Sequence, residues 1–433
     1  PQIAVTNNEV AFYNAVGAGI PVSAGGLDFN TAAVANNGLL KLNRVNGAFN
    51  YFSYAGGPLS TFVYPSQIQA AANGDLIISG ISNSPFLPTT PNAIQPYQSY
   101  YEPRGYAGPD CYFMHFTRQN QLAYCTYLGG EGYDAFLGAG VHGDNVYIPM
   151  HTASNNFPVT GNATQLVNKG TKGAPSSIVV VAGEFALLKY NIPERKITYS
   201  SFIGTDINDA ISASSFDRDI AYLSLRATHY AAKPLLKDFP VSGDAFQKTM
   251  TGQNNTGVVA DHQYIAKINT TTGKLLYGTY LGSLPVSKGE FSKAMIVDND
   301  NIFIAGQSRS NDYPVTQGAT RTTYLDTSDI FVTKLSLCHT AIINDSIFPQ
   351  NILVCANGIV PAITGSVPET VNPSVILRNN IPQSVSGLSN FNYQWQQSKN
   401  GSTWSNITGA AGRNYQPGPV TSTRYFRRIA FTP

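Results

Sequence analysis

Charged residues are scarce in this sequence. Lys and Arg number 27, Asp and Glu number 25, and together they make up 12% of 433 residues with a formal net charge of +2. Soluble domains usually carry about 25% charged residues. A chain without a basic excess has no means of neutralising a run of phosphates, so we expect no nucleic-acid partner. We also expect no membrane span in this chain, because no stretch approaches the about 18 consecutive apolar residues that a crossing needs.

Motifs of known catalytic chemistry are missing as well. There is no Gly-x-Ser-x-Gly turn and no phosphate-binding loop. The six histidines show none of the spacings of a zinc site. The sequence therefore predicts no catalytic residues, no metal site, no cofactor and no enzyme. Acidic residues such as Asp217, Asp219, Asp298 and Asp300 lie in short turns, where we expect structural roles, although calcium binding stays open.

Turn-forming and aromatic residues are abundant instead. The chain contains 39 Gly, 26 Pro and 25 Tyr. This composition is typical of many short strands joined by turns. The sequence therefore predicts an all-β protein.

Three landmarks recur along residues 1–338. The first is an aromatic or aliphatic residue followed by Pro, and its prolines are Pro21, Pro88, Pro158, Pro240 and Pro314. The second is an aromatic residue, a small or aliphatic residue and Gly, ending at Gly56, Gly129, Gly204 and Gly282. The third is a strand with a central Lys, represented by Lys41, Lys189, Lys267 and Lys334, with His115 in the second copy. All three share a period of about 70 to 80 residues, which indicates one repeated unit.

Each unit contains four strand-like runs, as expected for a blade of a β-propeller. Two pairs of runs are joined by tight turns, and the second and third runs by a long connection. We predict a propeller over residues 1–338, with copies that begin near residues 3, 67, 137, 211 and 294. The fifth copy lacks its fourth strand, so either further blades lie upstream or the ring closes with five. A stack of unrelated β-sandwiches is the alternative.

The units resemble the bacterial seven-bladed β-propeller (SBBP) repeat. The runs 275–282 (Leu-Leu-Tyr-Gly-Thr-Tyr-Leu-Gly) and 124–130 (Tyr-Cys-Thr-Tyr-Leu-Gly-Gly) carry the resemblance. It implies an exported protein, and the repeat has no defined catalytic residues.

Residues 339–433 lose this period and contain both tryptophans, Trp395 and Trp404. A Trp on a central strand and a Tyr near a late strand, here Tyr425, predict an immunoglobulin-like β-sandwich, without the second Cys of antibody domains. Residues 393–398, 404–410, 415–417 and 424–428 resemble the Ig-like module of giant surface proteins of Bacteroidota, a group that includes gliding-motility adhesins. This resemblance implies export by the type IX secretion system and a location on the outer cell surface.

Four cysteines suggest disulfides in an exported protein. Cys111 and Cys125 flank one hairpin turn, so we predict that they lie nearly opposite each other and form a bridge. Cys338 and Cys355 could join the two domains, with about 3 kcal/mol of stabilisation from the loop that they close. Alternatively, Cys355 pairs with a Cys beyond residue 433.

Tyrosines gather in one long connection, which is the candidate ligand-binding segment. It contains Tyr97, Tyr100, Tyr101, Arg104 and Tyr106. Tyrosine offers a large contact area with a polar tip, which suits a glycan or protein ligand. Packing of these rings against the blade is the alternative.

One modification follows from the resemblance. Asp345-Ser346-Ile347 fits the Asp-Ser/Thr-aliphatic pattern of O-glycosylation in Bacteroidota, which makes Ser346 the candidate acceptor.

Two functions of different class fit these observations. The first is a non-enzymatic surface adhesin or display protein whose partners are the secretion machinery and a surface glycan or protein. The second is a secreted polysaccharide-active enzyme with an accessory Ig-like module. A carboxylate pair in the central funnel would favour the enzyme.

Overall fold

A computed structural model of the chain describes most of the strands and part of each long connection. The described residues are 2–17, 19–28, 36–55, 63–82, 84–99, 110–132, 134–170, 184–205, 210–229, 239–249, 260–283, 289–298, 301–325, 327–336, 342–343, 346–367, 369–370, 376–378, 381–383 and 391–431. These residues form two compact units. The first comprises Pro1–Val297, Phe303–Ser310 and Asp326–Thr333, and the second comprises Asp298–Ile302, Asn311–Leu325 and Lys334–Pro433. The domain boundary predicted at residue 338 lies outside the described residues.

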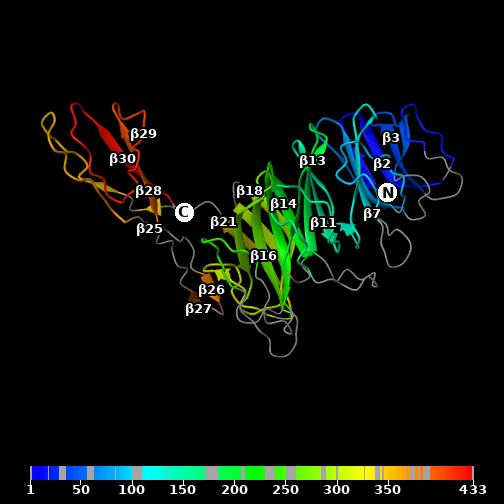
Figure 1. Cartoon of the computed structure of the whole chain (residues 1–433). Coiled ribbons are helices and arrows are strands. Elements are labelled where there is room, and N and C mark those ends of the chain that lie inside the picture. The colour runs from blue at the N-terminus through cyan, green and yellow to red at the C-terminus, as the bar shows by residue number, and fades with distance from the viewer. Residues whose placement is uncertain are drawn as a thin grey trace. The chain divides into compact units, whose positions relative to one another are not determined.

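The first unit is built from antiparallel sheets in which most strands pair with the next one in sequence (Figure 1). Blade 1 contains β1 (Gln2–Val5), β2 (Glu9–Val16), β3 (Asn36–Asn43) and β4 (Phe49–Ala55). Blade 2 contains β5 (Val63–Ala70), β6 (Leu76–Ser82), β7 (Asp110–Phe116) and β8 (Leu122–Leu128). Blade 3 contains β9 (Asp134–Phe136), β10 (Gly140–His142), β11 (Asn145–Thr152), β12 (Glu184–Asn191) and β13 (Lys196–Ile203), and both β9 and β10 pair with β11.

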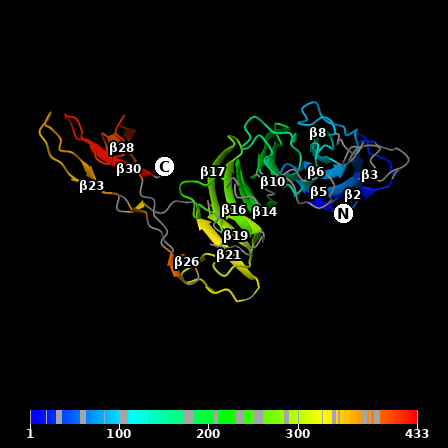
Figure 2. The ribbon, with the colours of Figure 1, turned by 60° about the horizontal axis from the view of Figure 1, so that its bottom comes forward.

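Two further sheets complete the series (Figure 2). Blade 4 contains β14 (Ala210–Asp217), β15 (Ile220–His229), β16 (Ala260–Asn269) and β17 (Lys274–Leu281). Among the described residues, blade 5 contains β18 (Glu290–Asp298), β19 (Asn301–Ser308) and β21 (Asp329–Ser336), of which residues 298, 301–302 and 334–336 belong to the second unit. The described residues contain no helix. The predicted all-β fold with four-stranded propeller blades is confirmed.

The Pro landmark and the aromatic landmark recur together because they touch. In blade 2, the Tyr127 hydroxyl accepts a hydrogen bond from the Leu87 backbone N–H, directly before Pro88, at 2.9 Å. Tyr280 makes the same contact with the N–H of Phe239 at 2.9 Å, and Tyr54 makes it with the N–H of Ile20 at 2.9 Å. In blade 3, where Phe202 has no hydroxyl, the rings of Phe202 and Phe157 lie 6.0 Å apart. The aromatic residue of the fourth strand therefore fixes the start of the long connection in blades 1 to 4.

A β-bulge follows the Lys landmark in each four-stranded blade. The register between the third and fourth strands shifts directly after Lys41, His115, Lys189 and Lys267. A bulge adds one residue to a strand and increases its twist. The repeat thus encodes both the pairing and the twist of the blade.

Apolar side chains fill the space between neighbouring blades. One cluster joins blades 1 and 2 around Tyr13 and Met114, and another joins blades 2 and 3 around Phe113 and Leu188. A third joins blades 3 and 4 around Leu187 and Tyr264. Blade 5 differs, because Ile330 and Val332 on β21 are 86% and 76% exposed.

The second unit consists of small antiparallel sheets. Their strands are β20 (Val315–Thr316) with β26 (Ile376–Arg378) and β27 (Ile381–Gln383), β22 (Ile342–Ile343) with β25 (Glu369–Thr370), β23 (Ile347–Phe348) with β24 (Thr364–Gly365), and β29 (Ser405–Asn406), β28 (Asn392–Ser398) and β30 (Tyr425–Phe431). Trp395 lies fully buried on β28, the central strand of the last sheet, and its indole N–H donates to the carbonyl of Gly412 at 2.9 Å. The Ig-like type of this unit stays a prediction.

Candidate functional site

The long connections all leave the blades at the same end. In each blade the second strand ends and the third strand begins at this end, which we call the loop face. The opposite end carries the tight turns between strands one and two and between strands three and four, and we call it the hairpin face. The predicted tyrosine segment belongs to the connection between β6 and β7, on the loop face.

A hydrogen-bonded clamp holds the start of this connection in blade 2. The Gln95 side chain donates to Asp110 Oδ2 at 3.1 Å, and the Ser99 backbone N–H donates to the same oxygen at 2.8 Å. Gln95 Oε1 accepts from the N–H of Gly129 at 2.8 Å. The connection is thereby tied to the beginning of β7 and the end of β8.

Blade 3 repeats the same clamp with a longer acid. The Gln165 side chain donates to Glu184 Oε2 at 2.8 Å, and the Lys169 N–H donates to Glu184 Oε1 at 2.8 Å. The N–H of Gly204 donates to Gln165 Oε1 at 3.3 Å. The recurrence shows that Gln, acid and Gly act together to fix the base of a loop, irrespective of what the loop contains.

The clamp of blade 2 also lies against a second carboxyl group, from blade 3. A Cβ atom placed on Gly129 would lie 2.9 Å from Asp110 Oδ1 and 3.1 Å from Asp134 Oδ2, so both carboxyl groups border the same small space. Asp134 Oδ2 accepts from the N–H of Gly130 and from Ser154 Oγ, both at 2.8 Å. Asp110 and Asp134 are only 3% and 2% exposed. This space has room for a glycine at position 129 but not for a larger residue.

Burial dominates the electrostatics of the two carboxyl groups. It raises the pKa of Asp110 to about 8, where the hydrogen bond from Ser99 opposes the shift and the charge of Asp134 adds to it. Burial likewise raises the pKa of Asp134 to about 6. The pair therefore holds a proton near neutral pH. Because neither side chain reaches the surface, the pair offers no contact to a sugar ring and acts on the loop base instead.

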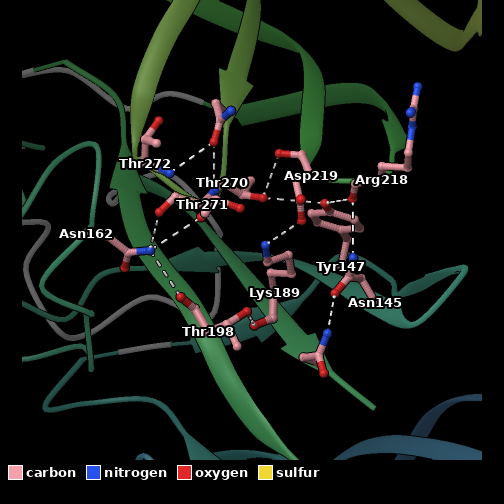
Figure 3. Close-up of polar contacts among 12 residues, drawn as sticks. Asn145, Tyr147, Asn162, Lys189, Thr198, Arg218, Asp219, Thr270, Thr271 and Thr272 are labelled. Carbon is pink, nitrogen blue, oxygen red and sulfur yellow. Dashed lines mark hydrogen bonds and ion pairs between the residues drawn. The ribbon is translucent and has the colours of Figure 1, made fainter. Parts of the chain in front are cut away.

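The hairpin face is occupied by contacts between blades, as Figure 3 shows for blades 3 and 4. Lys189 Nζ lies 3.0 Å from Asp219 Oδ1 in the β14–β15 turn. The Tyr147 hydroxyl donates to the Arg218 carbonyl, and the Asn162 side chain donates to the carbonyl of Thr271 at 3.1 Å. The Lys landmark thus serves the contact between two blades, and Asp219 has a structural role.

The second copy replaces this Lys by His115, which is also structural. His115 Nε2 lies 2.8 Å from Asp75 Oδ2, and His115 Nδ1 lies 2.8 Å from the Tyr190 hydroxyl of blade 3. Burial lowers the pKa of His115, although Asp75 opposes the shift. Among the described residues, no group of three or more His, Cys, Asp or Glu side chains is placed to hold a metal ion. Over the same part of the chain, no helix has the length and apolar character that a membrane crossing requires.

The structure describes one of the five predicted ligand-binding residues. Tyr97 is 80% exposed, and its carbonyl accepts a hydrogen bond from the clamp residue Gln95 at 3.2 Å. Tyr100, Tyr101, Arg104 and Tyr106 lie outside the described residues. Ser346, the predicted glycosylation site, is half-buried, and its backbone N–H donates to Ser366 Oγ at 2.8 Å.

The predicted bridge between Cys111 and Cys125 is wrong. Cys111 lies opposite Leu128 and Cys125 lies opposite Met114 in the pairing of β7 with β8. The two thiols belong to different apolar clusters, on opposite faces of the sheet, and both are free and buried. Cys355 is free and exposed, while Cys338 lies outside the described residues, so their pairing stays a prediction.

Sequence reasoning missed Asp110, Asp134 and the clamp. Gln95 and Gln165 stand seven residues after Pro88 and Pro158, and an acid opens the third strand of both blades, at Asp110 and Glu184. This repeated spacing was the available signal. The contact with Asp134 had no such signal, because it crosses from one blade to the next.

Comparisons with known proteins give little beyond the fold. A family model described as a domain of unknown function, DUF8696, matches residues 360–432. No curated protein matches the chain. One similar solved structure is the Synechocystis apocarotenoid oxygenase, with 10% identity, 99% of this chain and 74% of that chain covered, and a TM-score of 0.28. Another is the β-propeller domain of the Trilobed protease from Pyrococcus furiosus, with 5% identity, 89% of this chain and 98% of that chain covered, and a TM-score of 0.28. A third is a polysaccharide lyase, the PL25 ulvan lyase, with 10% identity, 84% of this chain and 76% of that chain covered, and a TM-score of 0.31.

These neighbours correct one prediction. The sequence predicted that the chain is not an enzyme, and this is contradicted, because the structures similar to it include an oxygenase and a polysaccharide lyase. A missing motif in one chain therefore does not exclude an activity. At TM-scores of 0.28 and 0.31, the likeness assigns neither activity to this protein.

Proposed function

We propose that the protein binds a surface glycan or protein through the loop face of its propeller. The observation that carries this proposal is Tyr97, which is 80% exposed directly beyond a clamped loop base. An exposed aromatic ring on a rigid base loses little conformational entropy on binding, so more of its contact energy appears as affinity. The hairpin face is less suited to binding, because its polar groups already join neighbouring blades.

We further propose that the protein acts on the outer cell surface of a bacterium of the Bacteroidota. The resemblance of residues 393–428 to the Ig-like modules of surface adhesins supports this location, export by the type IX secretion system and an association with gliding. In this proposal the second unit is an Ig-like spacer. Many copies on one cell would add weak contacts into firm attachment through avidity.

The test is binding of the fluorescently labelled chain to an array of immobilised polysaccharides and surface proteins. Tyr97→Ala is compared with Tyr425→Ala, which removes a ring that is 45% exposed in the second unit. We expect Tyr97→Ala to weaken binding by about tenfold or more, the usual effect of removing a central aromatic contact, and Tyr425→Ala to leave it unchanged. Unaltered binding of Tyr97→Ala, or equal loss in both variants, would refute the proposed binding surface.

A further inference from the structure

Blades 4 and 5 meet at a position where blade 4 departs from the repeat. Four residues before the bulge, the third strand carries Cys111 in blade 2 and Phe185 in blade 3, opposite Ile81 and His151 of the second strand. Blade 4 has Gln263 opposite Arg226 at the same place, near the loop face. Blade 1 has Asn37 opposite Ala15 at this place, so among the four-stranded blades only blade 4 combines a buried amide with a guanidinium. This combination signals a local requirement other than packing.

Gln263 is buried without satisfying its polar atoms. Its side chain is 0% exposed, and neither Oε1 nor Nε2 has a hydrogen-bond partner. Buried amides almost always find a partner, because an unsatisfied donor or acceptor costs folding free energy. The Gln263 amide is therefore an unoccupied donor and acceptor inside the junction.

Two guanidinium groups lie over the same aromatic ring beside this junction. Arg226 lies 4.9 Å and Arg309 lies 5.7 Å from the centre of the Phe291 ring. Such a contact can hold the Arg309 guanidinium in place while its N–H groups remain able to donate hydrogen bonds. Arg309 is exposed, and no described carboxylate lies within ion-pair distance of it.

The acid next to this ring has two serine partners. Glu290 Oε1 accepts hydrogen bonds from Ser283 Oγ at 3.1 Å and from Ser308 Oγ at 3.4 Å. Ser224 and Ser292 satisfy each other across the same two blades at 2.7 Å. The donors available to an incoming group are therefore the Gln263 amide and the exposed Arg309 guanidinium.

We infer that this junction binds an oxyanion, the carboxylate or sulfate group of an acidic glycan. The Arg309 guanidinium can donate two parallel hydrogen bonds to either group, and the Gln263 amide can donate a third from within the junction. The site rests on the proposed function, since it lies on the same loop face as Tyr97. It narrows the ligand from glycans in general to those that carry negative charge.

The test measures binding of the full chain to three soluble polymers by isothermal titration calorimetry. The polymers are polygalacturonate, dextran sulfate and uncharged dextran. The test variant is Arg309→Gln, and the matched control is Arg218→Gln. The control also removes one positive charge, but on the hairpin face of blade 4, where the Arg218 side chain is 87% exposed. We expect at least one charged polymer to bind, Arg309→Gln to weaken it tenfold or more, and Arg218→Gln to change it less than twofold.

Gln263→Leu separates binding from packing. It removes the unsatisfied amide, so we expect higher thermal stability together with several-fold weaker binding of the charged polymer. Higher stability with unchanged binding would overturn the role of Gln263. Equal effects of the two arginine variants, or no preference for charged polymers over dextran, would overturn the site. If the anion site is refuted in this way but Tyr97→Ala still weakens binding on the polysaccharide array, the loop face remains the proposed binding surface.

Discussion

Replacing Asp110 by Asn tests the claim that a buried carboxyl pair sets the pH dependence of the propeller. Asn has the shape of Asp and keeps one oxygen to accept from Ser99 and Gln95, but it does not ionise. Its amide group would face Asp134, to which it can donate a hydrogen bond. The variant therefore keeps the clamp and removes the second charge.

The direction of the effect follows from the proton that the folded state retains. Asp110 has a pKa of about 8 in the folded protein and about 3.8 when unfolded. Stability is therefore greatest below pH 4, falls as the pH rises toward 8, and levels off above it. Burial raises the pKa of Asp134 to about 6, so this residue adds a further loss of stability as the pH rises from 4 to 6. The Asp110 difference alone corresponds to an upper limit of about 6 kcal/mol, since each pKa unit is worth about 1.4 kcal/mol.

The assay is differential scanning calorimetry of the wild type and Asp110→Asn at pH 5, 7 and 9. Both tryptophans lie in the second unit, so tryptophan fluorescence identifies the transition of that unit and leaves the other one to the propeller. We expect the stability excess of the variant over the wild type to grow from about 1–2 kcal/mol at pH 5 to several kcal/mol at pH 9. Asp144→Asn, at an exposed position between β10 and β11, is the control and should change neither value. A variant that is less stable than the wild type at pH 9 would refute the reasoning.

The other predictions concern the thiols and the second unit. Without reductant, Cys355 should react with a thiol reagent in the native protein, and Cys111 and Cys125 should react only after unfolding. A pair of peptides linked by a disulfide between Cys111 and Cys125 in an unreduced digest would contradict the structure. Trp395→Ala should destabilise the second unit by about 3–5 kcal/mol, because it leaves a cavity at a fully buried position. Trp404→Ala should reduce the stability less, because Trp404 is only half-buried. Chemical unfolding monitored by the remaining tryptophan measures both, and equal losses would show that Trp395 does not organise the core.

The propeller could be predicted from the sequence because its determinants are local and repeated. The aromatic residue of the fourth strand binds the backbone beside the landmark proline, so both must keep one period. The cysteines show where this reasoning ends. In a regular hairpin Cys111 and Cys125 would share a face, but the bulge after His115 adds one residue and turns the two thiols to opposite sides. The Lys landmark marks where this bulge lies, but only the strand pairing shows that one residue is added there.

The candidate sites were harder to predict because they join distant residues. Asp110 and Asp134 meet only when blade 3 packs on blade 2, and Arg226 and Arg309 meet only at Phe291. Neither set forms a spacing pattern along the chain. The pair of Arg226 and Gln263 could still be found by aligning the blades, because only blade 4 of the four-stranded blades has an arginine opposite this position.

The repeated clamp has an evolutionary consequence. Gln95 with Asp110, and Gln165 with Glu184, fasten the roots of their loops without any side chain from the loop tips. Insertions, deletions and substitutions beyond these roots would leave the scaffold undisturbed, much as hypervariable segments do on an antibody framework. New specificities could then arise by transplanting a segment from one blade onto another.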